Sequence, residues 1–171
     1  DLAPNIRARF TEMFVDELVD PIELRVVVAR YLSSVLPVTD RPPEHTETVV
    51  TIVDLYLQCR DLAEKVLVDG SGQRPRYTLR TLTRALKAAH HLVLGQKFSL
   101  VRALYEGFQL AFQGSLDERS FKDVDKLLGK NLDLGLDKSQ MDHPGRRPGG
   151  RGDSAAFALI RPFWLEAGPI D

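Results

Sequence analysis

Between residues 20 and 128 the chain repeats apolar side chains every three or four positions, which is the spacing of amphipathic helices. The first helix is expected to start at Asp20, with Pro21 at its first position and Glu23 completing a capping box. Pro37 ends this helix after about Leu36. Its core face is expected to consist of Ile22, Val26, Ala29, Leu32 and Leu36.

A second helix is expected from about Glu44 to Leu67, after a proline-rich turn at residues 40–43. One face of this helix carries Val49, Val53, Tyr56, Ala63 and Leu67. The run at residues 49–53 has β propensity, so the helical spacing is a weaker guide in the first half of this segment.

The third expected helix is the most regular. It follows a polar loop at residues 69–75, starts at a cap on Thr78, runs to about Leu94 and ends at Gly95. Its core residues are expected to be Leu79, Leu82, Leu86, Ala89 and Val93.

A fourth helix fits residues 99–112, where an apolar side chain recurs every four positions. These side chains are Leu100, Leu104, Phe108 and Phe112. A fifth, short helix is expected from a cap at Ser120 to Leu128, with Gly129 after it.

The C-terminal part has a different composition. Residues 143–152 are glycine, proline and arginine with one histidine, and they cannot bury apolar area, so a loose loop is expected there. Residues 156–160 have the pattern of a short buried strand, and the apolar segment 163–165 needs a packing partner.

Composition narrows the class of protein. The chain has 171 residues, of which 43% are hydrophobic, which is enough for one domain with a core. A net charge of −1 argues against a polybasic nucleic-acid binder, and no apolar run approaches the ~18 residues of a membrane span. The single cysteine, Cys59, is expected to be a buried apolar filler rather than a reactive thiol.

Several kinds of catalytic site are missing from the sequence. There is no phosphate-binding loop of the form G-x-x-x-x-G-K-[ST], no nucleophile elbow, and no histidine beside Cys59. His90 and His91 are adjacent on a helix and point about 100° apart, so no metal site is expected from them. We therefore expect a part of a larger machine rather than a self-sufficient enzyme.

Two arginine clusters are the strongest candidates for function. Arg7 and Arg9 lie near the start of the chain, and Arg80 and Arg84 share one face of the third helix with Lys87 and His91. Arginine suits phosphate recognition because its planar guanidinium binds two oxygens and stays charged. Ordinary solvent-exposed arginines, an acidic partner on the basic face and RNA binding are the alternatives.

Four segments of the chain, 1–12, 76–86, 104–108 and 160–169, resemble the AAA modules of the midasin family, which are dynein-like AAA ATPases. The resemblance implies a mainly α fold: a helical AAA lid of about five helices, with short flanking strands from adjacent AAA cores. The implied division is residues 1–19 as the edge of an AAA core, 20–136 as the lid, 137–154 as a flexible loop, and 155–171 as a strand leading into the next module.

The resemblance also implies roles for the arginines. Arg9 is the arginine-finger candidate, with Arg7 as the alternative, and acts on ATP bound at a neighbouring module. Arg80 is the sensor-2 candidate, with Arg84 as second choice, and acts on ATP bound by its own module. ATP and magnesium are thus the cofactors of the parent protein. The fragment alone is expected to bind neither and to be inactive, because it lacks Walker A and Walker B.

For the parent protein the resemblance implies ATP-driven remodelling of large ribosomal subunit precursors in the nucleus, both nucleolus and nucleoplasm. The expected partners are adjacent AAA modules of the same chain, precursor particles and assembly factors, with no membrane and no sequence-specific nucleic acid. The alternative is a free-standing helical interaction module that docks an acidic partner through the basic face of the third helix.

Overall fold

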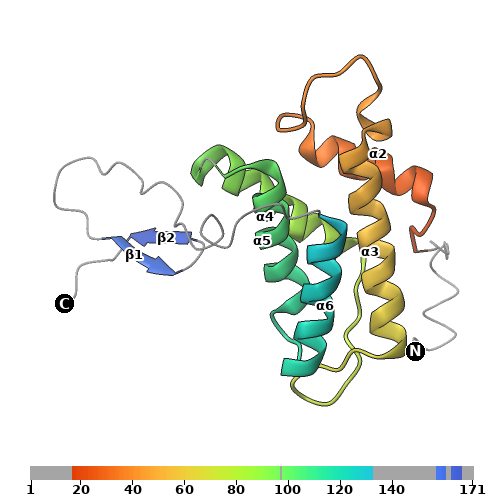
Figure 1. Cartoon of the computed structure of the whole chain (residues 1–171), viewed down its shortest axis with the longest axis vertical. Coiled ribbons are helices and arrows are strands. Elements are labelled where there is room, and N and C mark those ends of the chain that lie inside the picture. Colours follow the sequence, from red (N-terminus) through yellow and green to blue (C-terminus); the bar gives the residue numbers. More distant parts are fainter. Residues whose placement is uncertain (1–16, 97, 133–156, 161–162, 167–171) are drawn as a thin grey trace, which may run out of the picture.

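The computed structural model describes residues 17–96, 98–132, 157–160 and 163–166, and helices dominate this part of the chain (Figure 1). The helical elements are α2 (Pro21–Leu32), η1 (Pro43–His45), α3 (Glu47–Lys65), α4 (Leu79–Gln96), α5 (Leu100–Phe108), η2 (Gln109–Gln113) and α6 (Glu118–Asn131). Among them η1 is a short 3₁₀ turn and η2 is a π-helical turn that continues α5. The mainly α fold class expected from the sequence is confirmed.

The helices form a bundle in which each one packs against at least two other elements (Figure 1). The most extensive contact joins α4 to α5, while α2 packs on both α3 and α4. Helix α6 closes the bundle by packing on α3 and on η2. Helix α4 is therefore held by three neighbouring elements, α2, α5 and η2.

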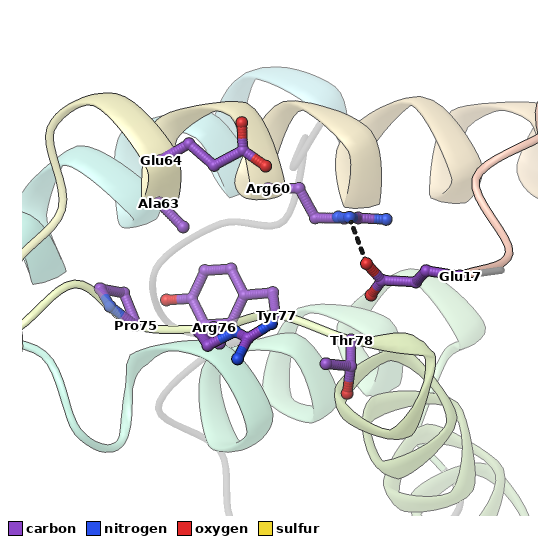
Figure 2. Close-up of a pocket in the computed structure, with 8 residues that line it drawn as sticks. All are labelled: Glu17, Arg60, Ala63, Glu64, Pro75, Arg76, Tyr77 and Thr78. Carbon is purple, nitrogen blue, oxygen red and sulfur yellow. Dashed lines mark hydrogen bonds and ion pairs between the residues drawn. The ribbon is translucent and has the colours of Figure 1, made fainter. Parts of the chain in front are cut away.

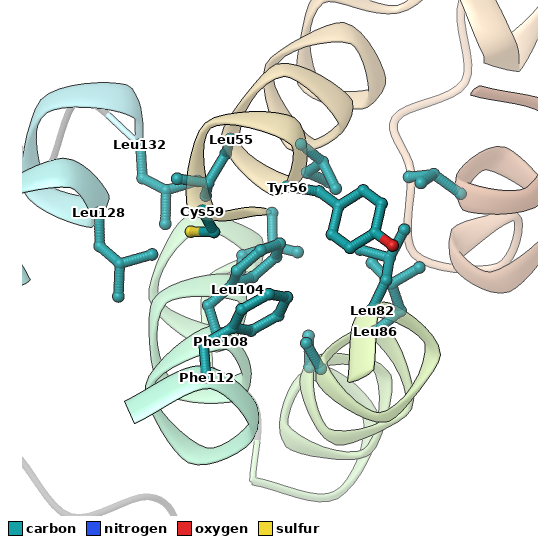
Figure 3. Packing of buried hydrophobic residues seen from close by; sticks show 14 of the residues in the cluster. Leu55, Tyr56, Cys59, Leu82, Leu86, Leu104, Phe108, Phe112, Leu128 and Leu132 are labelled. Carbon is teal, nitrogen blue, oxygen red and sulfur yellow. The ribbon is translucent and has the colours of Figure 1, made fainter. Parts of the chain in front are cut away.

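A single hydrophobic core joins these helices (Figure 3). Its central members, buried almost completely, are Leu55, Tyr56, Cys59, Leu82, Leu86, Leu104, Phe108, Phe112 and Leu128. The rings of Phe108 and Phe112 stack with centroids 5.0 Å apart, and Tyr56 meets Phe112 edge to face. Burying a side chain of this size stabilises a fold by about 1.5–3 kcal/mol, so this cluster is the main source of stability.

The predicted caps are partly confirmed. The predicted cap Asp20 accepts a hydrogen bond from the amide of Ile22 at 2.7 Å. Ser99, predicted only as the start of a helix, caps α5 by accepting from the amide of Arg102 at 3.4 Å. The prediction for Ser120 is wrong, because α6 begins two residues earlier, at Glu118, and Asp117 is its cap. The hydrogen bonds from Ser120 hold the pKa of the Asp117 carboxyl below its usual value.

Ser120 instead joins two distant loops. Its hydroxyl oxygen accepts a hydrogen bond from the amide of Val68 at 2.9 Å, and its side chain is buried. Beside it, Asp117 donates its amide proton to the carbonyl of Val68 and Gly70 donates to Ser115. These bonds tie the connection between α3 and α4 to the start of α6.

The core face expected for α2 is also partly wrong. Ile22 and Val26 are 69% and 56% exposed, whereas the buried residues of α2 are Leu24, Val28, Ala29 and Leu32. The helix has two overlapping apolar stripes, and its packing on α3 and α4 covers only one of them. The helix also ends at Leu32 rather than Leu36, in a turn whose amides bond back to the Leu32 carbonyl.

Other boundaries differ from the expected ones by a few residues. Helix α3 begins at Glu47 and is helical through the β-branched run, because Val49, Ile52 and Val53 are fully buried in the core. Helix α4 continues through Gly95 to Gln96, and α6 continues through Gly129 to Asn131. Glycine is thus tolerated near the ends of both helices, and neither ends where the sequence indicated.

A glycine also sets the distance between α4 and α5. A β-carbon added at Gly107 would lie less than 3.0 Å from the carbonyl oxygen of Ala85 and 3.1 Å from the amide nitrogen of Ala89. The backbones of the two helices therefore meet directly at this point.

The two described C-terminal segments are strands, β1 (Phe157–Ile160) and β2 (Phe163–Glu166). They pair antiparallel, with Phe157 opposite Glu166 and Ile160 opposite Phe163. The predicted strand at residues 156–160 corresponds to β1, and the apolar segment at 163–165 lies within its partner strand. Within the described residues, none of the helices is both long enough and apolar enough to cross a membrane.

Candidate functional site

Only one of the two candidate arginine clusters lies among the described residues. Arg7 and Arg9 lie outside the described residues, so the arginine-finger assignment stays a prediction. Arg80 and Arg84 lie on the first two turns of α4 with exposed side chains, one helical turn apart. No ion pair among the described residues includes either of them.

The part of α4 that carries Arg80 and Arg84 is held in place by core packing on its other side. On the opposite side of the same turns, Leu82, Ala85 and Leu86 are fully buried. Each arginine side chain is therefore exposed to solvent, while the opposite side of the helix that carries it packs in the core.

Tyr77 anchors the start of α4. Its hydroxyl donates a 2.6 Å hydrogen bond to the carbonyl of Phe112, and its ring lies 4.7 Å from the Phe112 ring. Burial raises the pKa of the Tyr77 phenol, so its hydroxyl remains a donor at neutral pH. Helix α4 thus begins two residues after this anchored side chain, at Leu79, and Arg80 lies three residues after it.

A small pocket lies beside this anchor (Figure 2). It has a volume of about 120 Å³. Residues from α3, from the segment before α4 and from the N-terminal side line it: Glu17, Arg60, Ala63, Glu64, Pro75, Arg76, Tyr77 and Thr78. Two acidic and two basic side chains share a space this small, so it is a mixed-charge pocket rather than an anion site.

An ion pair joins two of the residues that line this pocket. An Nη atom of Arg60 lies 2.9 Å from a carboxylate oxygen of Glu17 (Figure 2). The Arg60 guanidinium also lies 5.8 Å from the centre of the Tyr56 ring. Burial raises the pKa of the Tyr56 phenol. Glu17 is the first described residue, so the pair joins the start of the described chain to α3.

Sequence reasoning did not find Arg60 and Glu17. They are 43 positions apart, and nothing in their spacing marks them as partners. The folded contact between α3 and the chain before α2 brings them together, and no local pattern encodes such a contact.

The basic face of α4 divides into two parts. Arg80 and Arg84 lie at the start of the helix, and Lys87 and His91 line a separate concavity between α2 and α4. This concavity measures about 280 Å³ and is lined by Arg30, Tyr31, Lys87, His90 and His91. Lys87 lies 5.9 Å from the centre of the Tyr31 ring, and Ser34 and His90 share a 2.8 Å hydrogen bond.

The part of the chain that the structure describes has few features of a metal site or of a reactive thiol. It contains no group of three or more histidine, cysteine, aspartate or glutamate side chains placed to hold a metal ion. The rings of His90 and His91 are 6.0 Å apart and nearly perpendicular. Cys59 is fully buried in the core, where burial raises the pKa of its thiol to about 12, so the predicted role as an apolar filler is confirmed.

Comparison with known proteins gives a consistent result. The profile of the family described as Midasin AAA lid domain matches residues 23–134, which is more than half of the chain. Midasin from Dictyostelium discoideum is 33% identical over 176 aligned positions, covering 98% of this chain. Midasin from Giardia intestinalis is 33% identical over 136 positions, covering 77%. No solved structure matches the chain.

The chain spans only a small part of the length of these relatives. The matched region amounts to 3% of each of the two relatives. The family match lies within the segment 20–136 that the sequence assigned to a lid, while the other expected domain boundaries remain predictions.

Proposed function

The chain belongs to the midasin AAA lid domain family, and from this premise we propose that it couples the nucleotide state of an AAA module to the shape of an AAA ring. A midasin AAA lid implies adjacent AAA modules in the same protein, and a lid between modules can exist in two positions that differ with the bound nucleotide. Coupling then means that contacts with the nucleotide bias one position over the other.

The observation that carries the proposal is the placement of Arg80. Its side chain is exposed, makes no ion pair among the described residues, and projects from the first turn of a helix whose opposite face is fully buried. A guanidinium there can bind two phosphate oxygens, and the N-terminal end of a helix also favours an anion. Arg84 is one turn further along the same face and is the second choice for this role.

ATP with magnesium is the group that the proposal requires. The described residues fit its phosphates, because Arg80 and Arg84 offer unpaired guanidinium donors at the start of α4. When bound, ATP supplies the phosphoryl group and magnesium offsets its charge. Since the sequence has no phosphate-binding loop, we expect other parts of the parent protein to hold the nucleotide and the lid to sense it.

Arg9 is proposed as the arginine finger, with Arg7 as the alternative, acting on ATP bound at a neighbouring module. The pairing of Glu17 with Arg60 supports this division of roles, because it ties the chain that follows these arginines to α3. The finger and the sensor would then act on two different nucleotides.

For the parent protein we propose remodelling of large ribosomal subunit precursors in the nucleus. Its proposed partners are those precursors and their assembly factors, besides the adjacent modules. The names of the relatives support this part of the proposal only through family membership.

The test is Arg80→Ala in the full-length protein, assayed for steady-state ATP hydrolysis and for binding of a fluorescent ATP analogue. We expect at least a tenfold loss of kcat/KM, with partial recovery in Arg80→Lys, which keeps the charge but loses the bidentate geometry. Arg119→Ala is the matched control, since Arg119 is an exposed arginine on α6. Unchanged hydrolysis and unchanged nucleotide affinity in Arg80→Ala would remove the basis of the proposal.

A further inference from the structure

The concavity between α2 and α4, here called the α2–α4 basic pocket, is lined by Arg30, Tyr31, Lys87, His90 and His91. Its volume of about 280 Å³ has room for one or two side chains of a partner. It is separate from the mixed-charge pocket at the start of α4, and the two share no lining residue. The proposed nucleotide-sensing role does not use it.

The charge of this pocket is of one sign. Two permanent cations and two imidazoles line it, and no carboxylate does. Within the described residues, neither Arg30 nor Lys87 takes part in an ion pair, and Glu23 is the only acidic residue on the two helices. Unpaired cations that converge from two helices attract an anionic group.

Two of the side chains that line the pocket are held by contacts within the protein. The hydrogen bond between Ser34 and His90 fixes one imidazole, and the position of Lys87 beside the Tyr31 ring fixes one ammonium group. One contact joins α4 to α2 through Tyr31, and the other joins α4 to the turn that follows α2 through Ser34. An anion would thus meet donors that are held in place, which lowers the entropic cost of binding.

An apolar surface borders the pocket on α2. Val26 is one turn before Arg30 on the same face and is 56% exposed, and Ile22, one turn earlier, is 69% exposed. Exposed apolar side chains at helical spacing favour a partner that buries them.

We propose that the α2–α4 basic pocket binds an acidic protein segment, whose carboxylates contact Arg30 and Lys87 and whose apolar side chain covers Val26. Protein is favoured over RNA as the partner for two reasons. The chain has a net charge of −1, and the one tyrosine among the lining residues, Tyr31, already has Lys87 near its ring. A single-stranded RNA site would combine a wider basic groove with free aromatic faces for stacking.

The test measures binding of a fluorescein-labelled peptide, Glu-Glu-Leu-Glu-Glu, to the 171-residue chain by fluorescence anisotropy. We expect saturable binding that weakens with salt, and roughly a tenfold increase in Kd in the double variant Arg30→Gln/Lys87→Gln. The control variant Lys122→Gln/Lys126→Gln on α6 changes the net charge by the same amount and should leave Kd unchanged.

A second readout locates the peptide. In NMR spectra the ring resonances of His90 and His91 should shift on titration, while those of His45, which lies on η1 outside the pocket, should not. The proposal is overturned if the two double variants weaken binding equally, if Gln-Gln-Leu-Gln-Gln binds as tightly, or if a single-stranded RNA oligonucleotide binds more tightly than the acidic peptide. Thermal unfolding of each variant checks that the fold is intact.

Discussion

Gly107 lies directly against the backbone of Ala85, so that a β-carbon at position 107 would come within 3.0 Å of the Ala85 carbonyl oxygen. The opposing atoms belong to the helical backbone of α4 and cannot rotate away as a flexible side chain would. Helices α4 and α5 can approach this closely only because residue 107 has no side chain.

Replacing this glycine should therefore destabilise the bundle. We expect Gly107→Ala to lower the free energy of unfolding by about 1–3 kcal/mol, the usual cost of overpacking, measured by urea denaturation followed by circular dichroism. Gly129→Ala is the matched control, because a β-carbon there meets no atom within 4 Å. That change should raise stability by up to about 1 kcal/mol through helix propensity. Equal stability of the two variants would contradict the close approach.

The hydrogen bond between Ser120 and Val68 gives a second prediction. Ser120→Ala leaves the Val68 amide without its acceptor in a partly buried place, so we expect a loss of about 1–2 kcal/mol. Hydrogen exchange should locate the effect, with faster exchange of the Val68 amide proton. Ser115→Ala changes an exposed serine in the same connection and should change neither quantity. Unchanged exchange at Val68 in Ser120→Ala would show that the bond does not form.

The ion pair of Glu17 and Arg60 should be stronger than an ordinary surface pair. The Arg60 side chain is only 16% exposed, whereas Lys122 and Glu118 form an ion pair with 64% and 85% exposure. In double-mutant cycles with glutamine substitutions, we expect a coupling energy of about 0.5–1 kcal/mol for Glu17 and Arg60 and less for Lys122 and Glu118. Added salt should reduce both. A coupling energy of zero for the first pair would mean that the segment before α2 is not tied to α3.

Cys59 predicts how stability changes at high pH. Burial raises the pKa of the Cys59 thiol from its ordinary value of 9.0 to about 12. Between these two values the unfolded chain loses the thiol proton while the folded chain keeps it. The free energy of unfolding should therefore fall with rising pH, with a slope of up to about 1.4 kcal/mol per pH unit from this group, and its contribution is complete below pH 9.0.

The variant Cys59→Ala isolates this effect. Tyr56, Tyr77 and Tyr105 also have pKa values raised by burial, but they are present in both proteins. The difference between the two pH slopes, from urea denaturation at a series of pH values, thus reports the thiol alone. Parallel slopes would show that Cys59 is accessible to water in the folded protein.

Much of the helical framework could be predicted from the sequence, because caps and apolar spacing act locally. Asp20 and Ser99 start helices as predicted, and every residue of the face expected for α3 is buried. Ser120 shows the limit of this reasoning. It has the right chemistry for a cap, but Asp117, three residues earlier, takes that role and leaves the serine free for a distant amide.

The candidate sites depend more on contacts between distant parts of the chain. The basic face of α4 follows from helical spacing alone, so Arg80, Arg84, Lys87 and His91 could be grouped in advance. Arg30 could not be added to that group, because only the packing of α2 on α4 brings it to Lys87. The exposure of Val26 had the same cause: α2 has two apolar stripes, and its neighbours decide which one is covered.

The contacts that hold α4 in place determine how this helix can move. Its start is pinned through Tyr77 to the carbonyl of Phe112, and its middle touches the backbone of α5 at Gly107. A helix of 18 residues is about 27 Å long, so a tilt of roughly 10° about the pinned end would carry the far end through about 5 Å. Helix α5 would move with α4, because the backbones of the two helices are in direct contact at Gly107. A small displacement of Arg80, which lies close to Tyr77, would thus accompany a larger displacement at the far end of α4.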